Sequence, residues 1–145
     1  MNKNNSIRHF SFCILLFFYG AILYAQKLNS KDLIGQWYVE GTLMGDLDDH
    51  WLLPHNQSNS ICGQDFNEFL EEGKGKEVRF DLKCKPKKKA FSWQLNQNQL
   101  TLTRGAKTKE FEIERFKNKQ LILSHRIRPK SAHKQYFVYS IKESP

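Results

Sequence analysis

Two cysteines, Cys62 and Cys84, have the spacing that most directly predicts a covalent bond in this chain. The turn-forming segment Glu71–Gly75 separates two strand-like segments, and a hairpin folded about Gly73 places the two cysteines opposite each other. An even number of cysteines in an exported chain is typical of a disulfide, which would here stabilise the fold by about 3 kcal/mol. The alternatives are two free thiols or a metal site, although no histidines stand at zinc-ligand spacing. The third cysteine, Cys13, lies in a segment that we expect to be removed.

The same hairpin predicts which side chains face the protein core. Its register places Phe66 opposite Phe80. Val78, Phe80 and Leu82 alternate with polar residues such as Arg79, which is the pattern of a half-buried strand. We therefore expect the apolar set to face inward.

No arrangement of side chains typical of an active site is found. The sequence has no G-x-S-x-G pattern, and the predicted disulfide leaves no nucleophilic cysteine. The group Asp48, Asp49 and His50 has neither EF-hand nor H-E-x-x-H spacing, so we expect solvated side chains. His125 is conceivable as an acid or base, without further support. We predict a non-enzymatic protein with no cofactor and no bound metal.

The segment Lys83–Lys89, which reads KCKPKKK, is strongly basic. It favours either contact with an anionic ligand or acidic surface, or simply the solubility of a loop. Nucleic-acid binding would need exposed aromatic side chains between the basic ones, whereas the aromatic residues of this chain alternate toward the predicted core. No nucleic-acid partner is expected.

Length, charge and the N-terminal segment predict the compartment. The chain has 145 residues, a length that suits one domain. It has 23 Lys and Arg against 15 Asp and Glu, which gives a formal net charge of +8. Lys3 and Arg8 precede an uncharged apolar segment that ends at Ala25, the layout of a secretory signal peptide. This segment is shorter than the ~20 apolar residues of a membrane span. We predict a signal peptide at 1–25, one domain at 26–145, no transmembrane span after cleavage, and a periplasmic or secreted protein.

Eight segments alternate apolar and polar residues, with turn-forming residues between them. They are the two arms of the cysteine hairpin and the ranges 36–44, 90–95, 99–103, 109–115, 120–126 and 134–142. Short strands at this spacing predict an all-β fold. Eight consecutive strands favour an antiparallel up-and-down barrel, because closure leaves no free edge.

Several of these residues resemble a known family. The segment Leu33–Trp37 contains the G-x-W pattern that begins the first strand of lipocalins. The order of the two cysteines, Trp93–Leu95 and Leu100–Thr103 resembles the small lipocalin-like domains exported by Bacteroidetes-type bacteria. The resemblance implies an eight-stranded antiparallel barrel, or calyx, with Trp37 packed across its closed end. In larger lipocalins an arginine of the last strand covers this tryptophan, but the last predicted strand here carries none.

Antiparallel order brings alternate strand ends together at an open mouth, opposite Trp37. We expect ligand contacts there from ten residues: Leu43, Trp51, Leu82, Phe91, Trp93, Leu102, Phe111, Leu123, His125 and Phe137. An eight-stranded barrel is just wide enough to be filled by side chains or to hold one small ligand, and the sequence leaves both open. Trp51, in the long loop at 45–61, is either a lid over the mouth or a plug of the core.

Two functions remain from the sequence. The first is an exported, non-enzymatic lipocalin-like protein that binds a small apolar or amphipathic molecule at the barrel mouth. The alternative is an interaction or inhibitor module with a filled barrel, which contacts an envelope or extracellular protein through its mouth loops. A void of ~300 Å³ or more at the mouth favours the first function, and a filled interior favours the second.

Overall fold

The structure is a computed structural model that describes residues 28–48, 50–128 and 132–142. The predicted signal peptide at 1–25 and Asp49 of the acidic group lie outside these residues. Within them, helix is confined to α2 (Ser30–Leu33) and a 3₁₀ turn at Glu71–Gly73. A helix of bilayer-spanning length and apolarity is not found in this part of the chain.

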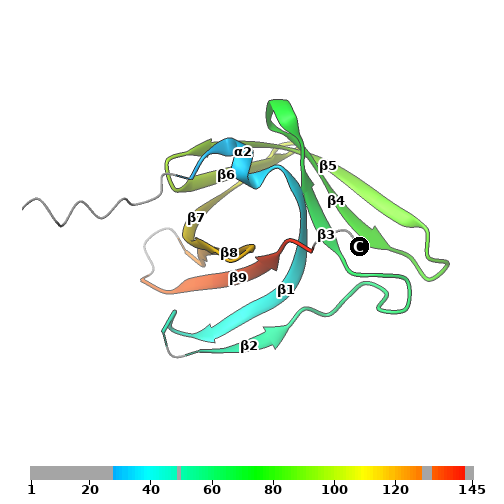
Figure 1. The fold of residues 1–145 in the computed structure, drawn as a ribbon, viewed down its shortest axis with the longest axis horizontal. Coiled ribbons are helices and arrows are strands. Elements are labelled where there is room, and N and C mark those ends of the chain that lie inside the picture. The colour runs from blue at the N-terminus through cyan, green and yellow to red at the C-terminus, as the bar shows by residue number, and fades with distance from the viewer. Residues whose placement is uncertain (1–27, 49, 129–131, 143–145) are drawn as a thin grey trace, which may run out of the picture.

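The strands form one antiparallel sheet that closes on itself (Figure 1). Neighbours follow the order β2-β1-β3-β4-β5-β6-β7-β8-β9, and β9 returns to pair with β1. The bounds are β1 (Gly35–Gly45), β2 (His50–Pro54), β3 (Phe66–Phe69), β4 (Lys74–Phe80), β5 (Pro86–Asn96), β6 (Gln99–Arg104), β7 (Lys107–Lys117), β8 (Gln120–Arg126) and β9 (Lys134–Ser140). Closure pairs the first strand with the last, as in an up-and-down barrel.

The strands β2 and β3 share one position in the barrel. Both run antiparallel to β1: β2 pairs with its second half, from Gly41 to Gly45, and β3 pairs with its first half, from Gly35 to Tyr38. The segment 55–65 leaves the sheet between them. Because two of the nine strands occupy one position, the barrel is eight-stranded, and the predicted fold class is confirmed.

Cys62 and Cys84 form the predicted disulfide, with Cα atoms 5.0 Å apart. Cys62 belongs to the segment 55–65, and Cys84 ends a turn in which its N–H donates to the Asp81 carbonyl at 3.0 Å. The bond therefore joins two loops next to the hairpin rather than two paired residues of adjacent strands. It ties the segment that leaves the sheet to the tip of the β4–β5 hairpin.

The register of the β3–β4 hairpin differs from the prediction. Phe66 pairs with Val78 and not with Phe80. The turn centres on Glu72, which has a φ of 58° and is followed by Gly73 with a φ of 68°. A turn centred one residue earlier shifts every cross-strand pair by two residues, so the expected pairing is wrong although the disulfide forms.

One end of the barrel is closed around Trp37, as the resemblance implied. This side chain is fully buried, and its indole Nε1 donates a 2.8 Å hydrogen bond to the Leu33 carbonyl of α2. The ring of Phe116, from β7, lies 5.9 Å from the indole centroid. In larger lipocalins an arginine of the last strand covers this tryptophan. Here the Phe116 ring packs against it.

Candidate functional site

A cavity of about 370 Å³ lies inside the barrel at the end opposite Trp37, and we call it the mouth cavity. Four of its apolar wall residues come from four different strands: Phe91 of β5, Leu102 of β6, Phe111 of β7 and Phe137 of β9. The rings of Phe111 and Phe137 meet edge to face at 6.1 Å. A void of this size exceeds the ~300 Å³ that favours a ligand over a filled interior.

The floor of the mouth cavity is a solid aromatic core. Phe69 contacts both Phe91 and Trp93 edge to face, with centroid distances of 5.4 Å in each pair. The indole Nε1 of Trp93 donates to the carbonyls of Lys74, at 2.8 Å, and Leu70, at 3.2 Å. Phe69, Phe91 and Trp93 belong to the same buried cluster as Trp37, so they separate the cavity from the closed end.

A carboxylate and two guanidinium groups form an ion cluster on the cavity wall. The Glu77 side chain is 10 % exposed, and its Oε1 lies 2.5 Å from Nε of Arg79, two residues along β4. Its Oε2 lies 2.5 Å from a terminal nitrogen of Arg104 on β6. Both arginines are about half exposed, so they also face the solvent side of the cavity.

The wall of the mouth cavity carries a surplus of positive charge. Lys107 and Lys109 of β7 join the two arginines, which gives four cationic side chains against two carboxylates, Glu77 and Asp65. No salt bridge engages either lysine within the residues that the structure describes. An anionic group that enters the cavity would therefore meet uncompensated cations.

Asp65 organises the segment 55–65 at the rim of the cavity. It is 2 % exposed, and its Oδ2 accepts hydrogen bonds from the Ser58 backbone N–H at 3.0 Å and the Ser58 hydroxyl at 2.8 Å. The same oxygen lies 3.0 Å from Nε2 of His55. Its Oδ1 is buried without a hydrogen-bond partner in the described residues, and Asp65 lines the cavity. A donor group on a bound molecule would satisfy this oxygen.

Tyr139 of β9 is a second polar group on the wall. Burial, together with the negative charge of Glu77, raises the pKa of its hydroxyl to about 12. The phenol therefore stays protonated at neutral pH and remains a hydrogen-bond donor that faces the cavity.

The structure brings four of the ten predicted ligand-contacting residues together at the cavity: Phe91, Leu102, Phe111 and Phe137. Two more, Trp93 and Leu123, face the interior but belong to the buried core. His125 lies beside the wall rather than on it, with its ring 5.6 Å from that of Phe111 and its Nδ1 2.9 Å from the Glu110 carbonyl.

Leu43 does not face the interior, contrary to the prediction. A β-bulge between Val39 and Gly41 inserts one extra residue into β1. Because side chains alternate along a strand, one inserted residue reverses which face every later side chain occupies. Leu43 therefore packs on the outside of the barrel with Ile122 and Val138, while its neighbour Thr42 lines the cavity.

Trp51 and Leu82 are also placed differently from the prediction. Trp51 belongs to β2, where it pairs with Met44 and is 60 % exposed, so it does not plug the core and is not part of the cavity wall. Leu82 lies in the turn after β4 and is 93 % exposed. The alternation of Val78, Phe80 and Leu82 predicts a strand through Leu82, but β4 ends at Phe80.

The cations of the mouth cavity were missed, although a signal for them existed. Leu102 and Phe111 were correctly expected to face inward. Extending the two-residue alternation from them gives Arg104 on β6, and Lys109 and Lys107 on β7. Glu77 and Arg79 were missed because the alternation of β4 predicts Val78 and Phe80 on the inner face. That prediction is wrong: Glu77 and Arg79 line the cavity, so Val78 and Phe80 point to the outside of the barrel.

Comparison with one solved structure supports the fold. The solved structure of Per a 4, a major allergen from cockroaches, is similar with a TM-score of 0.52 at 11 % identity, over 81 % of this chain and 71 % of that chain. An uncharacterized protein from Bacteroides eggerthii has a TM-score of 0.49 at 9 % identity, over 75 % of this chain and 99 % of that chain. No family model and no curated protein sequence matches. The closed barrel and the likeness to Per a 4 support a lipocalin-like fold.

Proposed function

We propose that this protein is an exported, non-enzymatic lipocalin-like barrel that holds one small amphipathic molecule with an anionic group in its mouth cavity. The observation that carries the proposal is a cavity of about 370 Å³ with an aromatic wall and a surplus of cations. We place the protein among the small bacterial domains of this type, in the periplasm or secreted. The Cys62–Cys84 disulfide is compatible with export into an oxidising compartment.

The size and lining of the cavity suit a small ligand. Ligand pockets span roughly 300–1,000 Å³ and combine an apolar wall with a few polar groups that fix orientation. The mouth cavity lies at the lower end of that range. Phe91, Leu102, Phe111 and Phe137 supply the apolar contact, and Tyr139 supplies a donor. An interaction module with a filled barrel is less well supported, because the mouth holds this void.

The charge of the wall favours an anionic head group. Arg79 and Arg104 are held at the cavity by Glu77 and retain half of their surface for other contacts. Lys107 and Lys109 add two cations that no described carboxylate engages. A carboxylate, sulfate or phosphate group of a ligand would bind here while its apolar part contacts the phenylalanine rings.

Calorimetric titration with three probes of equal chain length tests the proposal: decanoate, decanol and decyltrimethylammonium. We expect saturable binding of decanoate at one site, weaker binding of decanol, and the weakest binding of the cation. Variants Phe111→Ser and Phe137→Ser should each weaken decanoate binding. Absence of saturable binding by all three probes, or preference for the cation, would contradict the proposal.

A further inference from the structure

We propose that the disulfide-linked loops next to the mouth form a docking tip for the surface of an anionic lipid bilayer. The tip comprises residues 59–63 and 81–85, joined by Cys62 and Cys84. Figure 1 shows the β4–β5 hairpin extending past the body of the barrel, so its end is free to meet a flat surface. None of these residues lines the mouth cavity, and the inference does not depend on the proposed ligand.

Two large apolar side chains project from the tip into solvent. Ile61 is 94 % exposed and Leu82 is 93 % exposed, the two highest values among the exposed large hydrophobic residues described. Large apolar side chains that are exposed as a group are typical of a protein or membrane interaction site. Ile61 stands directly before Cys62, and Leu82 stands two residues before Cys84. The disulfide between these cysteines therefore joins the two loops that carry the exposed side chains.

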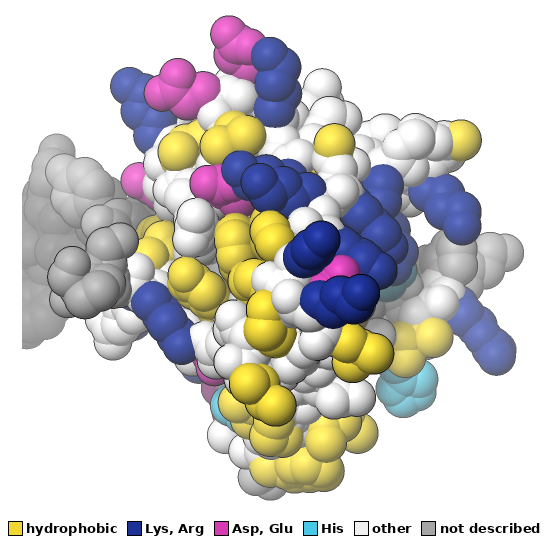
Figure 2. Space-filling view, turned by 90° about the vertical axis from the view of Figure 1, so that its right-hand side faces the viewer, with side chains coloured by type: hydrophobic (Ala, Val, Ile, Leu, Met, Phe, Trp, Pro, Cys, Tyr) yellow, Lys and Arg dark blue, Asp and Glu magenta, His cyan; other side chains and the backbone are white. Residues whose placement is uncertain are grey.

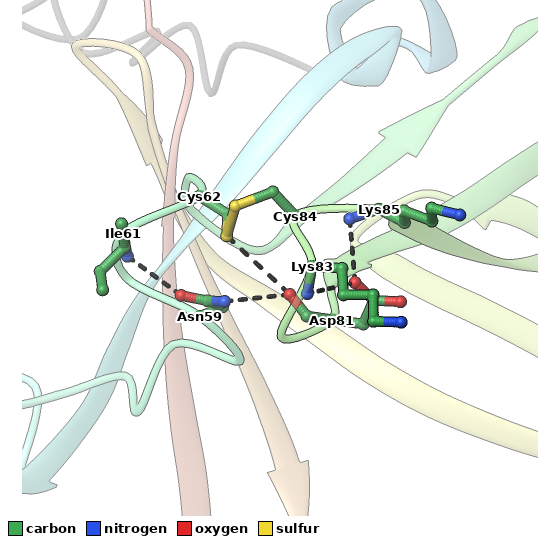
Figure 3. The surroundings of a disulfide bond; sticks show 7 residues. All are labelled: Asn59, Ile61, Cys62, Asp81, Lys83, Cys84 and Lys85. Carbon is green, nitrogen blue, oxygen red and sulfur yellow. Dashed lines mark hydrogen bonds between the residues drawn. A yellow bond between two sulfur atoms is a disulfide. The ribbon is translucent and has the colours of Figure 1, made fainter.

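The loops that carry these side chains are held by a hydrogen-bond network (Figure 3). Asn59 accepts from the Ile61 N–H at 3.2 Å and donates its side-chain amide to the Asp81 carbonyl at 2.9 Å. One carboxylate oxygen of Asp81 accepts from the backbone N–H groups of Lys83 and Lys85, both at 2.9 Å. Ile61 and Leu82 are thus presented on ordered turns, which reduces the entropy lost on docking.

Five lysines lie close to Leu82 in sequence. Lys83 and Lys85 lie in the turn, and three more follow at 87–89 on the first half of β5. No salt bridge joins these five lysines to a carboxylate in the part of the chain that the structure describes. Figure 2, which faces this side of the molecule, shows Lys and Arg side chains gathered beside a band of hydrophobic side chains.

This combination is complementary to a membrane surface that carries negative charge. Cationic side chains near such a surface each strengthen binding roughly fivefold, and apolar side chains beside them enter the boundary between head groups and acyl chains. An acidic protein surface would pair with the lysines. It would leave Ile61 and Leu82 exposed unless it also had an apolar pocket. An anionic bilayer can take up both the lysines and the apolar side chains without a complementary pocket. We therefore propose the bilayer, and not a protein, as the partner of the tip.

Vesicle cosedimentation tests the proposal with the purified full chain and its oxidised disulfide. The vesicles are phosphatidylcholine alone, or phosphatidylcholine with one quarter phosphatidylglycerol. We expect retention on the anionic vesicles only, and loss of retention at ~1 M salt, where charge interactions are screened beyond about 3 Å. The double variant I61S/L82S should reduce partitioning roughly tenfold or more, since two apolar side chains no longer leave water.

Two matched variants control for general loss of hydrophobicity and charge. I127S changes a residue that is 63 % exposed in the segment after β8, away from the tip. K31Q/K117Q removes two exposed lysines at the closed end, for comparison with K83Q/K85Q at the tip. The proposal is supported if both controls bind the anionic vesicles like the wild type and K83Q/K85Q partitions onto them roughly 25-fold less.

Three outcomes would overturn the proposal. These are equal retention on neutral vesicles, equal losses in the control and tip variants, and no retention on anionic vesicles. The last outcome would exclude the bilayer as the partner of the tip. Because Ile61 and Leu82 contact solvent almost entirely, their substitution removes few internal contacts, and a circular dichroism melt of I61S/L82S verifies the fold. An unchanged decanoate titration of this variant separates the tip from the mouth cavity.

Discussion

Arg104 on β6 places a terminal nitrogen of its guanidinium group 2.5 Å from the carboxylate of Glu77 on β4, across the strand that lies between them. This ion pair connects the two walls of the mouth cavity on either side of β5. Glu77 is largely buried, whereas Arg104 keeps half of its surface exposed. The Glu77 carboxylate therefore positions the Arg104 guanidinium group at the opening of the cavity. An anionic ligand would compete with this carboxylate for the guanidinium group.

Glu77→Gln should raise the affinity for decanoate, because it removes a negative charge from the cavity while keeping the shape of the side chain. We expect a gain of roughly fivefold in the calorimetric dissociation constant, equivalent to about 1 kcal/mol. Glu110→Gln, which removes an exposed carboxylate of β7 that lies outside the mouth cavity, is the matched control. Weaker decanoate binding by Glu77→Gln would mean that the carboxylate holds the arginines in the geometry that the ligand requires.

Arg104→Gln should weaken decanoate binding about tenfold, because a charge-assisted hydrogen bond contributes about 1.5–3 kcal/mol. Decanol, which has no charge, should bind the variant and the wild type alike. The control is Arg115→Gln, since Arg115 is exposed on β7 and lies 3.9 Å from Asp48, outside the mouth cavity. Equal losses for decanoate and decanol would place the role of Arg104 in the shape of the cavity and not in its charge.

The barrel could be predicted from the sequence because apolar alternation repeats in nearly every strand. The predicted range 120–126 is identical to β8, and 99–103 differs from β6 by one residue. Alternation shows which face of a strand is buried, but not what covers it. In β4 the apolar residue Phe80 is covered from outside by the segment 55–65, since Gly63 lies against its ring.

The residues of the mouth cavity were harder to predict because two local irregularities set them. The bulge in β1 reverses the facing of Leu43, and the turn centred on Glu72 shifts the register of the β3–β4 hairpin. Each depends on backbone conformations that side-chain types specify only weakly. Phe91, Leu102, Phe111 and Phe137 lie on strands without such an irregularity before them, and these four face the cavity as predicted.

Replacing both Cys62 and Cys84 with Ser should lower the free energy of unfolding by about 3 kcal/mol, because the unfolded chain regains the entropy of the open loop. The thermal midpoint should fall by roughly 10 °C. Scanning calorimetry of the wild type with and without reductant measures the same effect. Decanoate binding should persist below the midpoint, since neither cysteine lines the cavity. An unchanged midpoint under reduction would contradict a structural role for the bond.

Trp37→Phe should destabilise the closed end by about 2–3 kcal/mol. The smaller ring leaves space in the core, and the Leu33 carbonyl loses its buried 2.8 Å hydrogen bond. Urea unfolding followed by circular dichroism measures the change in midpoint at constant slope. Trp51→Phe is the control, because that side chain is 60 % exposed and should shift stability by less than about 0.5 kcal/mol. Equal effects of both variants would exclude a special role for Trp37.

Glu114→Gln should reduce stability at neutral pH but not in acid. Burial opposes ionisation of Glu114, yet hydrogen bonds from Lys134, at 2.7 Å, and Ser124, at 2.6 Å, hold the pKa of its carboxyl below the usual value of 4.5. A lowered pKa means that the ionised group stabilises the fold fully above about pH 4.5, and that this contribution is lost as the pH falls through the lowered value.

Lys134 adds the opposite dependence at high pH. Hydrogen bonds to Glu112 and then Glu114 raise the pKa of its ammonium group above 10.5, so its contribution is present below that pH and is lost as the pH rises through the raised value. Urea midpoints of the wild type and Glu114→Gln should therefore differ between pH 5 and pH 10 and converge well below pH 4.5. A difference that stays constant down to the acid limit would show that Glu114 acts through packing and not through its charge.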